Sequence, residues 1–137
     1  MPEVSGSCAS KLQSQTMVPV HDRESHQIGL MVMQGKHSSP DPRWNDAMLT
    51  YTGMADITGT DGKQDGYFVN QHPNGDTSGG TFEATVTMVE GLPHLQGKWH
   101  LTFGTGTLEN VKGAGRFEAS MTSPVDSQMT WSGAYEL

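Results

Sequence analysis

The sequence predicts an all-β protein, an antiparallel β-barrel of about seven to eight strands with short hairpin connections. Three observations predict it. Apolar and polar residues alternate over several segments, which is the period of a strand. Glycine, proline, asparagine and aspartate cluster between these segments, as they do in tight turns. No stretch carries a sustained helical period.

The strand-like segments follow one another at regular spacing. The clearest alternation places Phe82, Ala84 and Val86 on one face and Glu83 and Thr85 on the other. The last segment runs to the C-terminus, where it would close a barrel and remove its exposed edges. The predicted strands are 27–36, 47–57, 63–72, 80–89, 95–103, 115–122 and 127–137, separated by turn residues at 60–62, 73–76, 90–93 and 123–126.

A chain of 137 residues predicts a single domain. We assign residues 25–137 to the barrel and residues 1–24, which are polar and mixed, to an N-terminal arm that packs on the domain or stays disordered. Cys8, the one cysteine, excludes an internal disulfide and is expected to be inert. Without a signal peptide or an apolar run of membrane-spanning length, we expect a cytoplasmic protein, or a secreted one if a leader has been removed.

Charge and motif spacing exclude several classes of function. Lys and Arg number 8 against 15 Asp and Glu, and the net charge of −7 argues against nucleic acid and anionic membranes as partners. The six histidines lack metal-ligand spacing, so neither a metal nor a cofactor is expected. The glycine-rich stretch 104–115 precedes a strand-like segment rather than a helix, so it predicts a hairpin connection, capped by Leu108 and Val111, and not a phosphate loop.

The segment from Phe103 to Phe117, FGTGTLENVKGAGRF, resembles the glycine-rich hairpin of the allene oxide cyclase-like barrels. It is most similar to a small, mostly uncharacterised bacterial branch, and the resemblance covers roughly residues 45–137. It implies an apolar lumen that restrains a flexible substrate, as in the plant members, which cyclise an allene oxide, and in bacterial relatives that cyclise polyketide-derived substrates. No catalytic residue of the plant enzymes is matched by position.

The apolar strand faces supply the candidate ligand-binding residues. Aromatic rings and methionines suit a small hydrophobic molecule, because methionine adapts to irregular shapes. The same side chains could instead fill a solid barrel core. The candidates are Phe82, Met88, Trp99, Phe103, Phe117, Met121, Trp131 and Tyr135.

The candidate catalytic residues form two groups. Glu83, His100 and Glu118 fall on the nominally outer face, where a solvated surface is the simpler interpretation. If the register were shifted by one residue, their side chains would point into the lumen and become candidate acids or bases. His72 and Tyr67 lie near the expected rim, where Asn70 and Asp76 could join them.

Three functions remain open at this point. The first is a cofactor-independent isomerase or cyclase acting on a hydrophobic substrate inside the barrel. The second is a non-catalytic binding protein for a small apolar ligand, and the third is an oligomeric structural barrel with a filled core. The segment 27–36 is apolar on both faces, which predicts a covered surface in a homodimer or homotrimer, or a second layer of the same chain.

Overall fold

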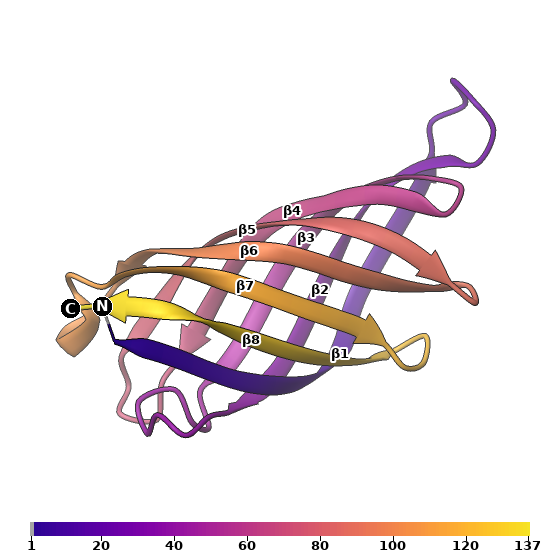
Figure 1. The fold of residues 1–137 in the computed structure, drawn as a ribbon. Coiled ribbons are helices and arrows are strands. Elements are labelled where there is room, and N and C mark those ends of the chain that lie inside the picture. The colour runs from indigo at the N-terminus through magenta and orange to yellow at the C-terminus, as the bar shows by residue number, and fades with distance from the viewer. Residues whose placement is uncertain (1) are drawn as a thin grey trace.

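In a computed structural model, residues 2–137 are described and form eight β-strands and one short 3-10 helix (Figure 1). No helix within these residues is long and apolar enough to cross a lipid bilayer. The strands are β1 (Glu3–Pro19), β2 (His26–Ser38), β3 (Met48–Thr58), β4 (Asp61–Gln71), β5 (Thr77–Val89), β6 (Leu92–Gly104), β7 (Lys112–Met121) and β8 (Asp126–Glu136), and the helix η1 is Gly106–Leu108.

Each strand pairs antiparallel with the next strand in the sequence, and β8 pairs with β1, so that the sheet closes on itself. This arrangement confirms the predicted antiparallel barrel. The glycine-rich stretch joins β6 to β7, and Leu108 and Val111 are buried there, as the hairpin interpretation predicts.

The strand with the clearest alternation points its apolar face into the barrel. On β5, the side chains of Phe82, Ala84 and Val86 are buried, while those of Glu83 and Thr85 are exposed. Because successive side chains of a strand point to opposite faces, this alternation fixes which residues are interior. The alternative register, in which the polar face would line the lumen, is therefore wrong.

The N-terminal segment differs from the predicted arm. Residues Glu3–Lys11 of β1 pair with β8, and the strand then continues along β2 as far as Pro19. Between Val4 and Leu12, the inward positions of β1 are the small residues Gly6, Cys8 and Ser10, and a Cβ atom on Gly6 would collide with the Trp131 ring. Small interior residues leave no hydrophobic alternation to recognise, which is why the sequence did not predict this strand.

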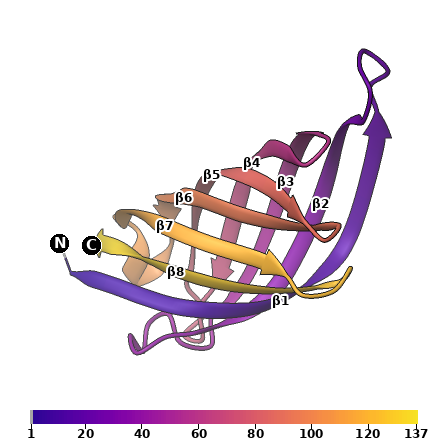
Figure 2. The ribbon, with the colours of Figure 1, turned by 45° about the vertical axis from the view of Figure 1, so that its right-hand side comes forward.

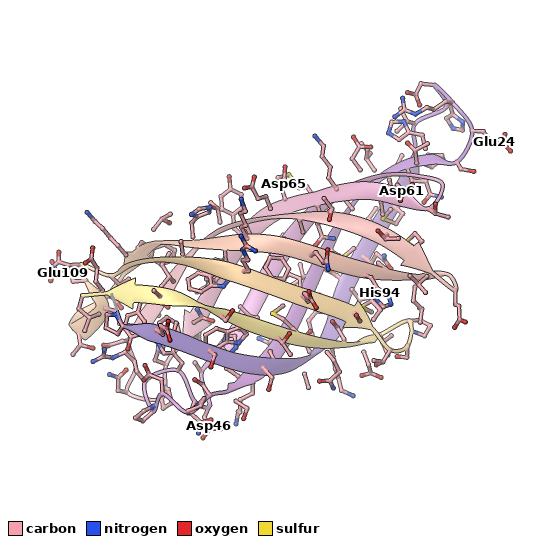
Figure 3. All side chains as sticks on the ribbon, viewed as in Figure 1. Glu24, Asp46, Asp61, Asp65, His94 and Glu109 are labelled. Carbon is pink, nitrogen blue, oxygen red and sulfur yellow. The ribbon has the colours of Figure 1, made fainter. Side chains whose placement is uncertain are left out.

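The two ends of the barrel differ in their connections (Figure 3). We call the end with Asp46 and Glu109 the loop end; it carries the connections 39–47, 72–76 and 105–111, and both chain termini. The opposite end, with Glu24, Asp61 and His94, is called the hairpin end, and its turns are 20–25, 59–60, 90–91 and 122–125.

His26 ties the long turn of the hairpin end to β3. Its Nδ1 lies 2.6 Å from Asp22 Oδ1 and its Nε2 lies 2.7 Å from Asp56 Oδ1. An ionised carboxylate only accepts hydrogen bonds, so both ring nitrogens carry protons and His26 is an imidazolium. The hydrogen bonds to Asp22 and then Asp56 raise the pKa of His26, and the turn is thereby held against the barrel.

Cys8 provides a test of β1 as a strand of the barrel wall. Its side chain is only 1% exposed, and burial raises the pKa of the thiol to about 11. Since the thiolate is the reactive species, we expect the native protein at pH 8 to react with a disulfide reagent at least about 100-fold more slowly than the unfolded chain. Rapid stoichiometric labelling of the native protein would contradict the buried position, and unfolding in urea is the control that exposes the thiol.

Candidate functional site

The barrel encloses an interior cavity of about 70 Å³ that reaches the loop end. Its lining is almost entirely apolar and aromatic; apart from the Tyr51 hydroxyl and the indole N–H groups, its polar groups belong to His37 and Asn70. All three tryptophans of the chain contribute to it. The lining residues are Val4, His37, Trp44, Leu49, Tyr51, Phe68, Asn70, Phe82, Trp99, Leu101, Phe117, Met129 and Trp131.

Trp44 closes the loop end of this cavity. It belongs to the connection 39–47, which we call the lid loop, yet its side chain is only 4% exposed. The indole ring packs edge-to-face against His72 and Tyr135, with ring centroids 4.8 Å and 5.5 Å away. Edge-to-face contacts of this kind add to the energy of apolar burial, so the lid loop is fastened by its own aromatic side chain.

Four buried side chains at the loop end form a continuous hydrogen-bonded series, which we call the polar chain: His37, Asn70, Ser78 and His72. Nε2 of His37 lies 2.8 Å from Oδ1 of Asn70. The Asn70 amide lies 3.3 Å from the Ser78 hydroxyl, which lies 2.8 Å from Nε2 of His72. The four members come from four segments: His37 from β2, Asn70 from β4, Ser78 from β5 and His72 from the connection 72–76.

The partners at the two ends of the polar chain indicate where each histidine carries its proton. The Trp131 indole can only donate, and it lies 3.1 Å from Nδ1 of His37. Nδ1 must therefore accept, so His37 carries its proton on Nε2 and donates to Asn70. At the other end, the Arg43 carbonyl can only accept, and it lies 2.9 Å from Nδ1 of His72. His72 thus carries a proton on Nδ1. Because burial lowers the pKa of His72, Nε2 is unprotonated and accepts from the Ser78 hydroxyl.

Both histidines are consequently neutral. Burial is the main cause that lowers the pKa of His37 and of His72. Below about pH 6.5 these two histidines are protonated in the unfolded chain but still neutral in the native state. They therefore favour the folded state fully only above the ordinary histidine pKa of about 6.5. That contribution is lost as the pH falls from about 6.5 through the lowered pKa values of the folded protein.

The lid loop is attached to the barrel on three sides. The Ser39 hydroxyl donates to the Ser5 carbonyl at 2.6 Å, and the Tyr135 hydroxyl donates to Asp41 at 2.7 Å. The third attachment is the bond from His72 to the Arg43 carbonyl. Nε1 of Trp44, by contrast, has no hydrogen-bond partner within residues 2–137, and a buried donor without a partner costs about 1–3 kcal/mol.

The predicted ligand-binding residues divide between the cavity and other places. Phe82, Trp99, Phe117 and Trp131 line the cavity. Tyr135 is buried beneath the lid loop, and Met88 and Met121 pack against the core away from the cavity lining.

Phe103 was wrongly placed inside the barrel; its side chain is 44% exposed. Leu101 and Phe103 pair with the adjacent residues Gly80 and Gly79, so Thr102 is an extra residue in β6. Such a β-bulge reverses the alternation. The Phe103 ring then covers the outer side of Gly79, where a Cβ atom would lie 2.6 Å from it.

Of the predicted catalytic residues, only His72 joins the interior site. Tyr67, Glu83 and His100 line a shared depression on the outer surface, and the Tyr67 side chain is 63% exposed. Glu118 lies elsewhere on the outside and accepts a hydrogen bond from Gln96. These four side chains face away from the lumen, because they occupy the outward positions of their strands.

Asn70, expected to accompany His72, does so through Ser78. The carbonyl of Asp76 accepts a hydrogen bond from the His72 amide at 2.8 Å, but its carboxylate lies outside the polar chain and accepts from Asn74 and Thr107.

Sequence reasoning missed His37, Trp44 and Ser78. His37 follows Met33 and Gly35 at alternate positions, so the strand period itself could have placed it inside. Trp44 is a large aromatic residue within the otherwise polar connection SSPDPRWND, which is a signal that the connection folds back onto the barrel. Ser78 offered no such signal, because serine is common at exposed strand ends.

Among residues 2–137, no group of three or more histidine, cysteine, aspartate or glutamate side chains is arranged to hold a metal ion. In comparisons with known proteins, no protein-family model matches the chain and no curated protein matches it. The interior geometry is therefore the observation from which function is inferred.

The direction of the polar chain can be measured by the nitrogen shifts of the histidine rings. At pH 7 we expect His37 to be the neutral Nε2–H tautomer, since Trp131 donates to its Nδ1. We expect His72 to be the neutral Nδ1–H tautomer, since the Arg43 carbonyl accepts from Nδ1 and burial lowers the pKa of the ring. As the pH falls, their imidazolium signals should appear together with the loss of native signals. Assignment with His37→Gln and His72→Gln identifies each ring, and an imidazolium at either position at pH 7 would contradict the bond directions.

Proposed function

We propose that the protein binds a small apolar molecule in the barrel lumen. The observation that carries this proposal is the cavity itself, whose lining is apolar and aromatic except at His37 and Asn70. Pockets of this character, with one or two placed polar groups, suit small hydrophobic ligands. The resemblance of residues 103–117 to the allene oxide cyclase-like barrels supports the same function, because those barrels hold their substrates in an apolar lumen.

The polar chain limits what the ligand can carry. Both ring nitrogens of His37 are occupied, by Trp131 and Asn70. The Asn70 amide accepts one hydrogen bond and donates one, which leaves one N–H and one oxygen lone pair. We therefore expect a neutral ligand with a single oxygen function, such as a ketone or an alcohol, because a charge would be desolvated without an opposite charge beside it.

The size of the cavity limits the ligand further. A cavity of about 150 Å³ accommodates benzene, and this one is about 70 Å³. A ligand of benzene size or larger requires the side chains around the cavity to move. Trp44 is the side chain most suited to move, because it sits on a connection rather than on a strand and its N–H lacks a partner within the described residues.

A cofactor-independent isomerase or cyclase is the second candidate, and the observation that favours it is the neutral His37 beside the cavity. If Trp131 moved away, Nδ1 of His37 could take a proton from the carbon next to a ketone and return one to the same carbon. With cyclopentanone in D₂O, this activity would appear as accelerated exchange of those protons for deuterium. Exchange at the uncatalysed rate, or exchange that persists in His37→Gln, would exclude this role.

Binding itself can be tested with cyclopentanone as the probe and cyclopentane as its apolar counterpart. We expect cyclopentanone to cause saturable amide shifts around the cavity, with a Kd of about 1 mM, as fits a ligand of few atoms. It should bind more tightly than cyclopentane because only the ketone can accept a hydrogen bond from Asn70. Leu101→Phe, which fills the cavity, should weaken binding at least about tenfold.

The matched control is Thr102→Val, which alters the exposed neighbour of Leu101 without reaching the cavity. Two outcomes would contradict lumen binding. One is the absence of saturable shifts with either probe, which would favour a filled structural barrel. The other is unchanged cyclopentanone affinity in Leu101→Phe, which would place the probe elsewhere on the protein.

A further inference from the structure

The barrel wall has an open edge at the hairpin end. β1 pairs with β8 only through Lys11, and the last contact on that side is the bond from the Leu12 amide to the Val125 carbonyl, 2.8 Å long. β1 continues along β2 as far as Pro19. Within the described chain, residues 13–18 therefore have a neighbouring strand on one side only, and Figure 2 shows β1 extending past the beginning of β8.

This edge is only partly protected against pairing. Soluble proteins block open strand edges with charged side chains, proline, β-bulges or a covering segment. β1 has a bulge at Gln13, which has no partner on β2, and residues 14–18 beyond it pair with β2 in regular register. The sequence of residues 13–18 is QSQTMV, which contains no charge and no proline. The side chains of Gln13, Ser14, Gln15 and Thr16 are all exposed, so no segment among residues 2–137 covers them. Pro19, which has no N–H, marks the natural end of the pairing edge.

A second copy of the chain fits this edge. An edge strand always complements its own copy when the two run antiparallel about a twofold axis, and an uncharged segment brings no like charges together. The flanking charges favour the same alignment. Lys11 lies just before the edge, with its side chain 75% exposed and its Nζ 3.6 Å from Asp126 of the same chain. The turn just after the edge carries Asp22, Arg23 and Glu24, and Asp22 is already paired with Arg23 and His26. Antiparallel pairing brings Lys11 of each copy toward Glu24 of the other.

Exposed apolar residues lie at both limits of the edge. Val20, in the turn after Pro19, and Val125, beside Leu12, are each exposed in the single chain. The antiparallel arrangement places Val20 of one copy toward Val125 of the other. We propose that the protein forms a homodimer in which residues 13–18 of two β1 strands pair antiparallel about a twofold axis.

The dimer is tested with reciprocal charges at the centre of the edge. Gln15 is exposed and near the proposed axis, so in Gln15→Lys and in Gln15→Glu each homodimer would place two like charges close together. By sedimentation velocity we expect the unsubstituted protein to dimerise with a micromolar Kd, as small interfaces do. Each variant should dimerise at least about tenfold more weakly, and mixing the two should restore association.

Thr52→Lys is the matched control, because Thr52 is an exposed outward position on β3, a strand with neighbours on both sides. It should dimerise as the unsubstituted protein does. Leu30→Lys tests the alternative that two copies pack through the outer face of β2, where Leu30 and Ile28 are exposed.

Three results would overturn the proposal. One is a monomer at every concentration up to about 1 mM. Another is undiminished dimerisation of both Gln15 variants. The third is loss of the dimer in Leu30→Lys alone, which would assign the interface to the outer face. The proposal stands apart from ligand binding, so either can fail without the other.

Discussion

The pairing of β1 with β8 is the constraint on which the rest of the structure depends. Without it, the sheet would have two open edges and no enclosed lumen. The pairing runs from Glu3 to Lys11, and it requires glycine at position 6 on the inner side of β1, since Gly6 lies against the Trp131 ring. Trp131 in turn donates to His37. Closure of the barrel and construction of the candidate site are therefore parts of one arrangement.

The polar chain shows how a small barrel can bury polar groups without burying charge. A charged imidazole in the apolar interior would cost several kcal/mol unless an opposite charge accompanied it. Each member of the polar chain instead donates to the next, and the series ends on the Arg43 carbonyl. His26 at the hairpin end is the opposite case, because two carboxylates surround it and it is charged. The same residue type thus serves two ends of the barrel in two protonation states.

The fold could be predicted from sequence wherever side-chain size followed the strand period. β5 and β8 show this, since large inward residues alternate with polar outward ones and both strands were placed correctly. β1 could not be recognised, because Gly6, Cys8 and Ser10 interrupt its apolar face, and the need for glycine at position 6 comes from Trp131, which is distant in the sequence. Phe103 was misplaced because a single extra residue, Thr102, reverses the alternation, and nothing in the local sequence announces a bulge.

The candidate site was harder to predict than the fold for a related reason. The polar chain, Trp44 and Trp131 come from β2, β4, β5, β8 and two connections, and only closure of the sheet brings them together. His72 could be suspected from its place at a strand end, but its partner Ser78 and the role of Trp44 depend on how the lid loop folds back.

The two ends of the barrel are suited to different tasks. The hairpin end has two connections of two residues each, 59–60 and 90–91, and such turns cannot open without breaking the strand register. The loop end has the longer connections, and the lid loop is held there by a few hydrogen bonds and one aromatic side chain. The loop end is therefore the end at which a molecule can enter the lumen, by displacing Trp44. Pairing through residues 13–18 would engage the hairpin end, leaving the lid loop free to move in each copy.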